Sequence, residues 1–321
     1  MTLPDGKPLR LVFGETVTEL AAKDPRIVVL DGDLGSSTQA KIFEDAYPER
    51  FYQMGIAEQN MLGVAAGMAK TGLVPFISTF VAFALHRPLD QIRVLIAQTG
   101  ANVKITAGYC GLFTGKAGKT HQIVDDISIA RAMPGMVVIS PADEVETKEV
   151  MAWALGYEGP VFIRLVRDVT QQLFQPGHRF QFGRVKTVRE GSDITLISTG
   201  TQTPRVVDAA DILAAAGIEA HVVHMPTIKP IDVAGVVEAA EKTGRVVTVE
   251  EHTVIGGLGG AVAETLSEHR PTRVDRIGLQ DHYTESATDD ELLDMYCLSA
   301  ERVAQRVQKL MKSDVPVTSC D

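Results

Sequence analysis

The sequence predicts an α/β protein with two domains, each built on a parallel sheet. The chain of 321 residues is long enough for two ordinary domains. Short apolar runs alternate with helical patterns along most of the chain, and such alternation forms parallel sheets with helices on both faces. One segment rich in Gln, Phe, Pro and charge, from about Asp168 to Gly191, interrupts the alternation and divides the chain.

The first half begins with a helical pattern over 14–23, which ends at Asp24-Pro25. The strand predicted over 26–30 is apolar at every position from Ile27, as is typical of a strand covered on both faces. A glycine-rich loop over 108–119 divides the later elements. These elements are strand 50–54, helix 59–70, strand 73–79, helix 81–98 and strand 102–107, then helix 125–132, strand 136–140, helix 143–157 and strand 160–165.

The second half follows a linker in which we expect one hairpin. Its predicted elements are strand 193–199, helix 202–216, strand 218–224, helix 232–242, strand 244–250, helix 258–268, strand 273–278 and helix 299–312. The last residues, SDVPVTSCD, are expected to be disordered. The pattern therefore predicts a first domain over 1–170, a linker over 171–191 and a second domain over 192–321.

The composition restricts the partners of this chain. A formal net charge of −10 without a long basic run argues against nucleic acid or an anionic membrane as the main partner. We find no apolar segment of signal-peptide or transmembrane length, so a cytoplasmic protein is expected. Three scattered cysteines, Cys110, Cys297 and Cys320, show neither metal-ligand spacing nor a disulfide pattern, which fits a reducing compartment.

The segment from Phe51 to Phe83 holds a single acidic residue, Glu58, among neutral, small or apolar side chains. One interpretation is a charge at a helix N-terminus, which the helix dipole stabilises modestly. The other is a buried acid, because a helix that is apolar nearly all round lies in a large core or an interface. A buried, unpaired carboxylate is costly, so a buried Glu58 is expected to have either a partner or a function.

Other candidate side chains follow predicted strands. Phe80 and Phe83 are either core aromatics, the interpretation favoured for them alone, or the lining of a slot for a flat ring. His121 ends the glycine-rich loop on the ligand side of a parallel sheet, where it is a candidate acid or base. Arginine at the end of the sixth strand can bind phosphate or carboxylate. We expect Arg164, one step inside the strand that leads to Arg167, to form an interdomain ion pair instead.

Two further polar segments follow strands. The loop from Asp31 to Thr38 lies at the carboxyl end of a strand, where open α/β sheets bind ligands. In the second half, Glu250-Glu251-His252 ends a strand, and the glycines over 256–260 open a helix. This second segment is either an anion site or a place of tight strand–helix packing.

Taken together, these segments resemble transketolase. The resemblance runs in the family's order from about Pro8 to Met311 and rests on GIAEQNMLGVAAGMA, STF-x-x-F, the loop ending in THQ, GPVFIRLVRD and VEEHTVIGGLGGAVAE. It implies a thiamine-diphosphate pyrimidine-binding domain followed by a transketolase C-terminal domain. In this family a glutamate at the position of Glu58 contacts N1′ of the cofactor's aminopyrimidine and promotes loss of the thiazolium proton.

The resemblance also implies roles for other residues. His121 matches a histidine that faces the substrate and assists proton transfer, so Glu58 and His121 are the expected catalytic residues. Around the cofactor we expect Phe80, Phe83 and Asp33, and at the substrate we expect Ser37, His121 and Arg167.

Two departures from the family pattern concern the sugar. Four residues before His121 the family has an acidic residue that contacts a substrate hydroxyl, whereas this chain has Ala117 between Lys116 and Lys119. A further family histidine falls near Tyr109. The resemblance therefore implies an intact cofactor half and an altered sugar-reading half.

The diphosphate half of the cofactor site is not expected on this chain. A complete transketolase is roughly twice as long, and its first domain holds Mg²⁺ and the diphosphate through a GDG…N motif. This chain has Asp31-Gly32-Asp33 but no such motif. We therefore expect no metal ligands here. An obligate N-terminal transketolase subunit would carry the Mg²⁺ site, with thiamine diphosphate at the interface of an α₂β₂ assembly.

Three functions stay open at this point. The leading one is a subunit of a split transketolase that transfers a two-carbon ketol unit from a ketose or its phosphate to an aldose or its phosphate. A β subunit of a 2-oxoacid dehydrogenase E1 component shares the length and a GIAEQ-like segment, but STF-x-x-F and THQ favour transketolase. The third is a non-catalytic subunit on a degenerate fold, against which the joint presence of Glu58, Phe80 and His121 argues.

Overall fold

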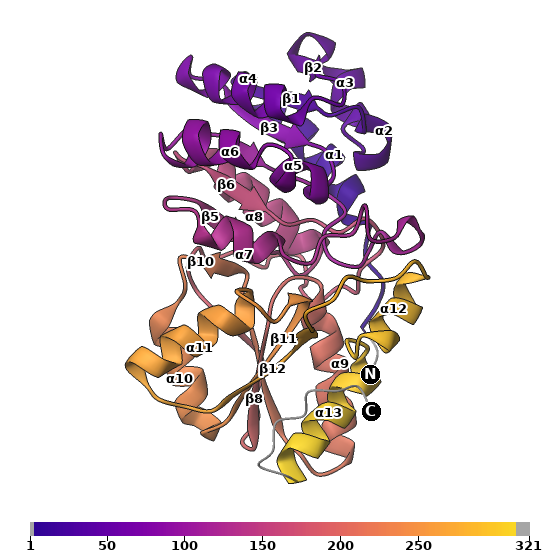
Figure 1. The fold of residues 1–321 in the computed structure, drawn as a ribbon, viewed down its shortest axis with the longest axis vertical. Coiled ribbons are helices and arrows are strands. Elements are labelled where there is room, and N and C mark those ends of the chain that lie inside the picture. Colours follow the sequence, from indigo (N-terminus) through magenta and orange to yellow (C-terminus); the bar gives the residue numbers. More distant parts are fainter. Residues whose placement is uncertain (1–2, 313–321) are drawn as a thin grey trace.

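The computed structural model describes residues 3–312 and shows two α/β domains, one above the other in Figure 1. The upper domain contains a seven-stranded sheet and the lower domain a five-stranded sheet. The first sheet consists of β1 (Ile27–Asp31), β2 (Phe51–Gln53), β3 (Val74–Ser78), β4 (Lys104–Ile105), β5 (Val137–Ile139), β6 (Val161–Ile163) and β10 (Thr227–Lys229). The second consists of β7 (Lys186–Arg189), β8 (Ile194–Ser198), β9 (Ala220–His224), β11 (Val246–Thr253) and β12 (Val274–Leu279).

The strand orders are β10-β5-β6-β4-β3-β1-β2 and β12-β11-β8-β9-β7. Each sheet is parallel except for one edge strand, β10 beside β5 and β7 beside β9. The central strands β1, β3 and β8 are buried at every position, so helices cover both faces of each sheet. The predicted fold class, two domains with mostly parallel sheets, is confirmed.

The helices fill the connections between strands. In the first domain α1 packs against α8, α4 against β3, and α5 against α7. Their bounds are α1 (Leu9–Ala21), α2 (Gly35–Thr38), α3 (Lys41–Ala46), α4 (Glu58–Lys70), α5 (Val81–His86), α6 (Leu89–Gln91), α7 (Asp126–Ala132) and α8 (Glu144–Gly156). The second half adds α9 (Gln202–Ala215), α10 (Val233–Thr243), α11 (Leu258–His269), α12 (Asp289–Met295) and α13 (Ala300–Lys312). Three short turns complete the set: η1 (Pro48–Arg50), the π-helical η2 (Ile92–Ala97) and η3 (Gly115–Ala117).

Several predicted elements differ from the observed ones. The helix predicted over 81–98 is divided into α5, α6 and η2, with Pro88 at the first break because proline has no N–H for the helical ladder. The short helices α2, α3 and α12 were not predicted. The hairpin predicted in the linker is wrong, because β7 pairs with β9 instead of a strand of the linker. The disorder expected at the C-terminus concerns residues 313–321, outside the described part of the chain.

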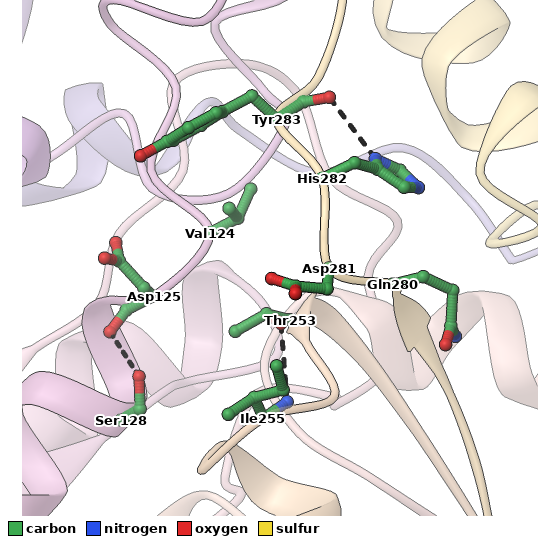
Figure 2. A pocket seen from close by; sticks show the side chains of 9 residues that line it. All are labelled: Val124, Asp125, Ser128, Thr253, Ile255, Gln280, Asp281, His282 and Tyr283. Carbon is green, nitrogen blue, oxygen red and sulfur yellow. Dashed lines mark hydrogen bonds between the residues drawn. The ribbon is translucent and has the colours of Figure 1, made fainter.

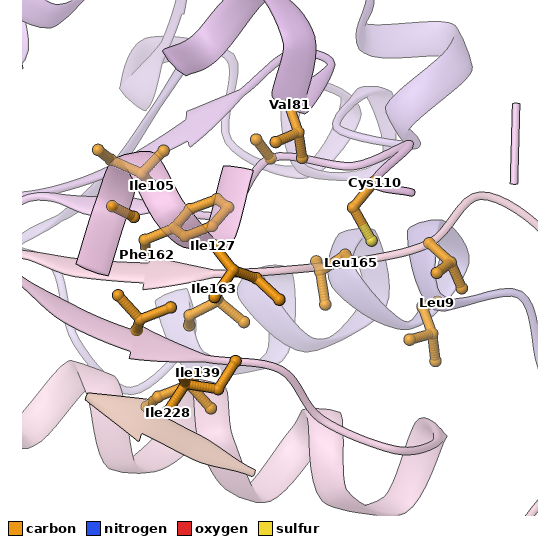
Figure 3. Packing of buried hydrophobic residues seen from close by; sticks show 14 of the residues in the cluster. Leu9, Val81, Ile105, Cys110, Ile127, Ile139, Phe162, Ile163, Leu165 and Ile228 are labelled. Carbon is orange, nitrogen blue, oxygen red and sulfur yellow. The ribbon is translucent and has the colours of Figure 1, made fainter. Parts of the chain in front are cut away.

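Strand β10 joins the two halves of the molecule. It comes from the second half of the sequence but pairs antiparallel with β5 of the first sheet, with Thr227 opposite Ile139. Ile228 is buried in the same core cluster as Ile139 and Ile163, and Figure 3 shows these side chains close together. The amino group of Lys229 donates to the carbonyl of Arg131 at 2.9 Å. The hydrophobic core of the first domain therefore includes part of the second half.

The buried Arg164 lies at the junction of the two halves. Its Nε donates to Asp126 Oδ2 at 2.6 Å and its Nη2 to the main-chain carbonyl of Glu251 at 2.7 Å. The predicted ion pair exists, but its carboxylate belongs to the first domain, and the contact between domains is made to the main chain. Among the cysteines, Cys110 is a buried free thiol. Within residues 3–312, no helix is long and apolar enough to cross a membrane.

His252 of β11 caps helix α7 across the same junction. Its Nε2 accepts the N–H of Ile127 at 3.1 Å, and its Nδ1 donates to the carbonyl of Thr253 at 2.6 Å. Only a neutral imidazole has a ring nitrogen that accepts a hydrogen bond. Burial lowers the pKa of His252 from 6.5, although the charge of Asp126 opposes this, so the neutral form is favoured in the folded protein.

This cap predicts a pH dependence of stability. Because the pKa of His252 is lower in the folded protein, the imidazole of the unfolded chain takes up a proton first as the pH falls. The contribution of the cap to the free energy of unfolding is therefore complete above about pH 6.5 and decreases below it. We expect the gap in thermal midpoint between wild type and His252→Gln to narrow by a few degrees from about pH 7.5 to about pH 5.5. His269→Gln, on an exposed part of α11, is the control. If the difference in thermal midpoint between wild type and His252→Gln does not change with pH, His252 does not cap α7 in its neutral form.

Candidate active site

The candidate residues gather at the carboxyl edge of the first sheet. The 31–38 loop follows β1, Phe80 follows β3, the 108–121 loop follows β4, and Arg167 follows β6. Main-chain hydrogen bonds tie these segments together: Gly32 N–H donates to Ser78 O at 3.0 Å and Val81 N–H to Gly108 O at 2.8 Å. Because the strands are parallel, segments distant in the sequence meet at one edge, where ligands bind in such folds.

An aromatic cluster forms at this edge. Phe80 stacks on Tyr109 with ring centroids 3.7 Å apart, and on Phe83 with centroids 5.7 Å apart. The ring of His121 meets Phe83 edge-on at 5.3 Å. The structure therefore brings together Phe80, Phe83 and His121 and adds Tyr109, whose left-handed backbone (φ 66°) is unusual for a bulky residue and turns the chain at this point.

Glu58 is the first residue of α4 and is only 3% exposed. Its Oε1 accepts a hydrogen bond from Arg87 Nη1 at 2.6 Å, so the buried carboxylate has a charged partner in this chain. The guanidinium carbon of Arg87 lies 3.9 Å from the centre of the Phe83 ring. Arg87 therefore connects the buried carboxylate to the aromatic cluster. It is 29 residues away in sequence, and no local pattern relates it to Glu58.

Helix α4 has two different faces. One face is buried on the sheet through Met61, Leu62, Ala65 and Ala66. The other carries Gly63, Val64 and Met68, which are only partly buried in this chain, and the exposed Gly67. Ile56, just before the helix, is 73% exposed. The helix is therefore only half covered by its own domain, and an apolar surface remains at its other face.

The carboxylate that shapes the 31–38 loop is Asp31. It is fully buried and accepts hydrogen bonds from the N–H groups of Leu34 and Gly35, both at 2.9 Å, and from Ser78 Oγ at 2.8 Å. Burial raises its pKa, and these hydrogen bonds oppose the rise. Asp33 lies on the exposed part of the loop with a left-handed backbone (φ 65°). Of the two aspartates, Asp31 is therefore buried, whereas Asp33 is exposed.

Ser37 and Arg167 both lie next to Tyr109. The carbonyl of Ser37 accepts from the Tyr109 hydroxyl and from Arg10 Nη1, each at 3.3 Å. The guanidinium carbon of Arg167 lies 5.6 Å from the centre of the Tyr109 ring, and its Nη1 is 3.2 Å from Asp168 Oδ2. Arg167 is therefore beside the aromatic cluster, with Asp168 as its ion-pair partner.

The second domain holds the glycine-rich loop in place. Gln122 Nε2 donates to the carbonyl of Glu285 at 3.1 Å, and Lys119 Nζ lies 3.8 Å from the Glu285 carboxylate. Gly111 has φ 62°, and a side chain there would collide with the Glu251 carboxylate. The loop that carries Ala117 and His121 therefore rests on residues of the second domain.

Two cavities lie along the 119–128 segment, and His121 lines neither of them. One of about 300 Å³ is lined by residues that include Phe83, Arg87, Lys119 and Thr120. A second, of about 320 Å³, lies between the domains, and Figure 2 shows Tyr283 and Asp125 at its walls. Val124, Asp125 and Tyr283 line both cavities, so the two are neighbours. Small molecules thus have room between the aromatic cluster and the second domain.

The glycines at the start of α11 do not form an open anion site. The Glu250 carboxylate accepts the N–H groups of Leu258 at 2.6 Å and Gly259 at 2.9 Å. Burial raises the pKa of Glu250 to about 7, although these two N–H donors oppose it. A side chain at Gly257 would collide with Glu250. Of the two interpretations left open by the sequence, tight strand–helix packing is the one observed.

A buried carboxylate, stacked aromatic rings, a histidine and an arginine lie at the carboxyl edge of a parallel sheet, the place where such sheets bind ligands. The chain is therefore an α/β protein with a candidate ligand site at this edge. Its family follows from comparison with known proteins. Residues 6–172 match the transketolase pyrimidine-binding domain and residues 183–303 the transketolase C-terminal domain. The chain belongs to the transketolase family.

Its relatives include separate transketolase sections. The chain is 43% identical over 313 residues to a putative transketolase C-terminal section of Methanocaldococcus jannaschii, covering 96% of this chain and 98% of that protein. It is 38% identical to a 6-deoxy-6-sulfo-D-fructose transketolase subunit of a Clostridium species, covering 94% of each. A solved structure described as a split gene transketolase, inactive beta4 tetramer, is 45% identical with a TM-score of 0.89, covering 96% of this chain and 99% of that one. The chain is thus similar over nearly its whole length to separately encoded transketolase sections.

Proposed function

We propose that this chain is the C-terminal subunit of a thiamine-diphosphate-dependent transketolase that is active only with an N-terminal partner subunit. The enzyme would transfer a two-carbon ketol unit from a ketose or ketose phosphate to an aldose or aldose phosphate. The observation that carries the proposal is the position of Glu58, a nearly inaccessible carboxylate joined through one residue to the stacked rings of Phe83 and Phe80.

The residues present fit the pyrimidine end of thiamine diphosphate. A carboxylate can bond a ring nitrogen, and flat aromatic faces can hold the ring. When bound, the cofactor supplies the electron sink for carbon–carbon bond cleavage. Glu58 would hold the pyrimidine nitrogen and Phe80 and Phe83 its faces, while Asp33 belongs to the loop beside this pocket.

The substrate would meet residues on the other side of the aromatic cluster. His121 would take up and return the proton of a substrate hydroxyl, since a neutral imidazole both accepts and donates protons near neutral pH. Arg167 and Ser37 would hold the anionic end of the sugar. Ala117 stands between Lys116 and Lys119 in the sequence, and Lys119 lies 3.8 Å from the Glu285 carboxylate. These charged groups would be near the sugar in place of the missing acidic side chain.

The partner subunit is proposed to hold Mg²⁺ and the diphosphate. Among residues 3–312 there is no group of three side chains arranged to hold a metal ion. The half-covered helix α4, with Ile56 exposed before it, offers an apolar surface of the kind that subunits bury. We propose an α₂β₂ assembly in which this surface contacts other subunits. Within the chain, we propose that the first domain ends near residue 170 and the second begins near residue 191.

Reconstitution tests this function. We expect no ketose turnover by the isolated chain, and turnover after mixing with an N-terminal transketolase section, thiamine diphosphate and Mg²⁺. A donor panel containing xylulose 5-phosphate, fructose 6-phosphate and 6-deoxy-6-sulfofructose, with product measured by mass spectrometry, identifies the sugar. Ordinary activity with xylulose 5-phosphate removes the argument for an altered sugar-reading half.

Two results contradict the proposal. Tight thiamine-diphosphate binding and ketose turnover by the isolated chain would exclude an obligate partner. Decarboxylation of pyruvate or a branched 2-oxoacid with a lipoyl-protein acceptor, but no ketol transfer, would identify the 2-oxoacid dehydrogenase alternative. Light scattering of the mixture measures its mass and checks the α₂β₂ assembly.

A further inference from the structure

Arg87 contacts Glu58 and Phe83, the two side chains proposed above to bind the pyrimidine ring of the cofactor. Its Nη1 donates to Glu58 Oε1 at 2.6 Å, and its guanidinium carbon lies 3.9 Å from the centre of the Phe83 ring. A guanidinium and an aminopyrimidine are both flat groups that present nitrogen to a carboxylate and stack on an aromatic face. One carboxylate oxygen and one ring face do not accommodate both groups at once.

The main chain of Arg87 is anchored while its side chain is accessible. Its carbonyl accepts Gln59 Nε2 at 3.2 Å, which ties the residue to α4 next to Glu58. The side chain is 43% exposed and lines the cavity of about 300 Å³ beside Lys119 and Asp125. Rotation of the side-chain torsions alone can therefore turn the guanidinium toward this cavity. The Asp125 carboxylate at its wall is already paired with His86 Nε2 at 3.1 Å, so the displaced guanidinium would be held mainly by solvent.

We propose that Arg87 is a displaceable partner of Glu58, which keeps the buried charge paired and covers Phe83 until a pyrimidine ring takes both positions. This inference rests on the proposed function, because it assigns the pyrimidine contact to Glu58. Its physical consequence is a competition. The ion pair must break when the cofactor binds, so the strength of the pair reduces cofactor affinity by the same factor. Arg87 acts here through Glu58 and is a positioning residue.

Cofactor binding to the reconstituted complex tests the competition without an activity assay. We expect Arg87→Met to bind thiamine diphosphate, titrated calorimetrically with Mg²⁺, about tenfold more tightly than wild type, since a charge-assisted hydrogen bond no longer has to be broken. Arg87→Gln, which keeps a polar side chain, is the second variant if Arg87→Met does not assemble. The control is Arg26→Met, which breaks an exposed pair with Asp24 of similar length, 2.7 Å, before β1. Its affinity is expected to stay within about twofold of wild type.

The isolated chain provides a second measurement. Arg87→Met leaves the Glu58 carboxylate buried without its cation, so we expect a lower thermal midpoint. Adding Glu58→Gln to this variant removes the charge, and the double variant is expected to lose less than the sum of the two single losses. Additive losses would show that the two side chains do not act as a pair in solution, and would overturn the inference.

The variants also separate this inference from the proposed function. Weaker binding by Glu58→Gln together with unchanged or weaker binding by Arg87→Met and Arg87→Gln would overturn the competition and leave the role of Glu58 intact. A wild-type complex that does not bind thiamine diphosphate, or Glu58→Gln that binds it as wild type does, would contradict the proposed function itself.

Discussion

Replacing Glu58 by Gln is expected to lower kcat of the reconstituted complex roughly a thousandfold, the range in which a positioned acid or base contributes. The carboxylate is buried at the N-terminus of α4 and next to the aromatic cluster. An amide has nearly the same shape but carries no charge and exchanges no proton with a ring nitrogen. The loss is therefore expected in kcat at saturating substrate, measured with the best donor of the panel.

The control for this substitution is Glu49→Gln, on the exposed turn η1 shortly before β2 in the same domain. It makes the same chemical change away from the carboxyl edge of the sheet and is expected to keep wild-type kcat. Size-exclusion chromatography checks that both variants still assemble with the partner. A Glu58→Gln complex with unchanged kcat would support the alternative of a non-catalytic subunit.

Replacing Arg164 by Met is expected to reduce the free energy of unfolding by about 3–5 kcal/mol, the cost of leaving a buried charge without its partner. Asp126 is fully buried, and its Oδ2 lies 2.6 Å from Arg164 Nε. The same substitution removes the hydrogen bond to the carbonyl of Glu251, which connects the second domain. Urea unfolding of the isolated chain at neutral pH, followed by circular dichroism, measures the loss.

Two matched variants identify its cause. Arg26→Met removes an exposed ion pair with Asp24 and is expected to change stability by less than about 0.5 kcal/mol. Adding Asp126→Asn to Arg164→Met removes the unpaired charge and is expected to recover part of the loss. If Arg164→Met unfolds at the wild-type urea concentration, the buried pair does not hold the junction together.

The predicted elements agree best with the structure where the local sequence pattern and the tertiary environment favour the same secondary structure. Strands β1 and β3 are short apolar runs, and both faces of their sheet are covered by helices. Strand β10 is different, since its three residues Thr227–Lys229 have no pattern of their own. They become a strand because β5 offers an unpaired edge at that place.

Some residues of the candidate site can likewise be recognised from local sequence, whereas others depend on tertiary contacts. His121 could be selected because it ends a loop on the ligand side of a parallel sheet, whereas Phe80 and Phe83 could be selected through the resemblance of STF-x-x-F to transketolase. The sequence indicated Tyr109 only as a residue near the position of a family histidine. Its stacking on Phe80 depends on how a glycine-rich loop folds over the sheet edge. Asp31 and Asp33 stand two residues apart, and only the turn after β1 decides that Asp31 is the buried one.

The sequence by itself determined the fold class, the family and the residue types at the candidate site, because strand periodicity and short motifs are local properties of the chain. Only the tertiary structure decided which groups are partners: Arg87 with Glu58, Arg164 with Asp126, and His252 with the start of α7. These contacts join residues 29, 38 and 125 positions apart. A buried charge or an uncapped helix end requires a partner, but sheet order and domain packing decide which residue supplies it.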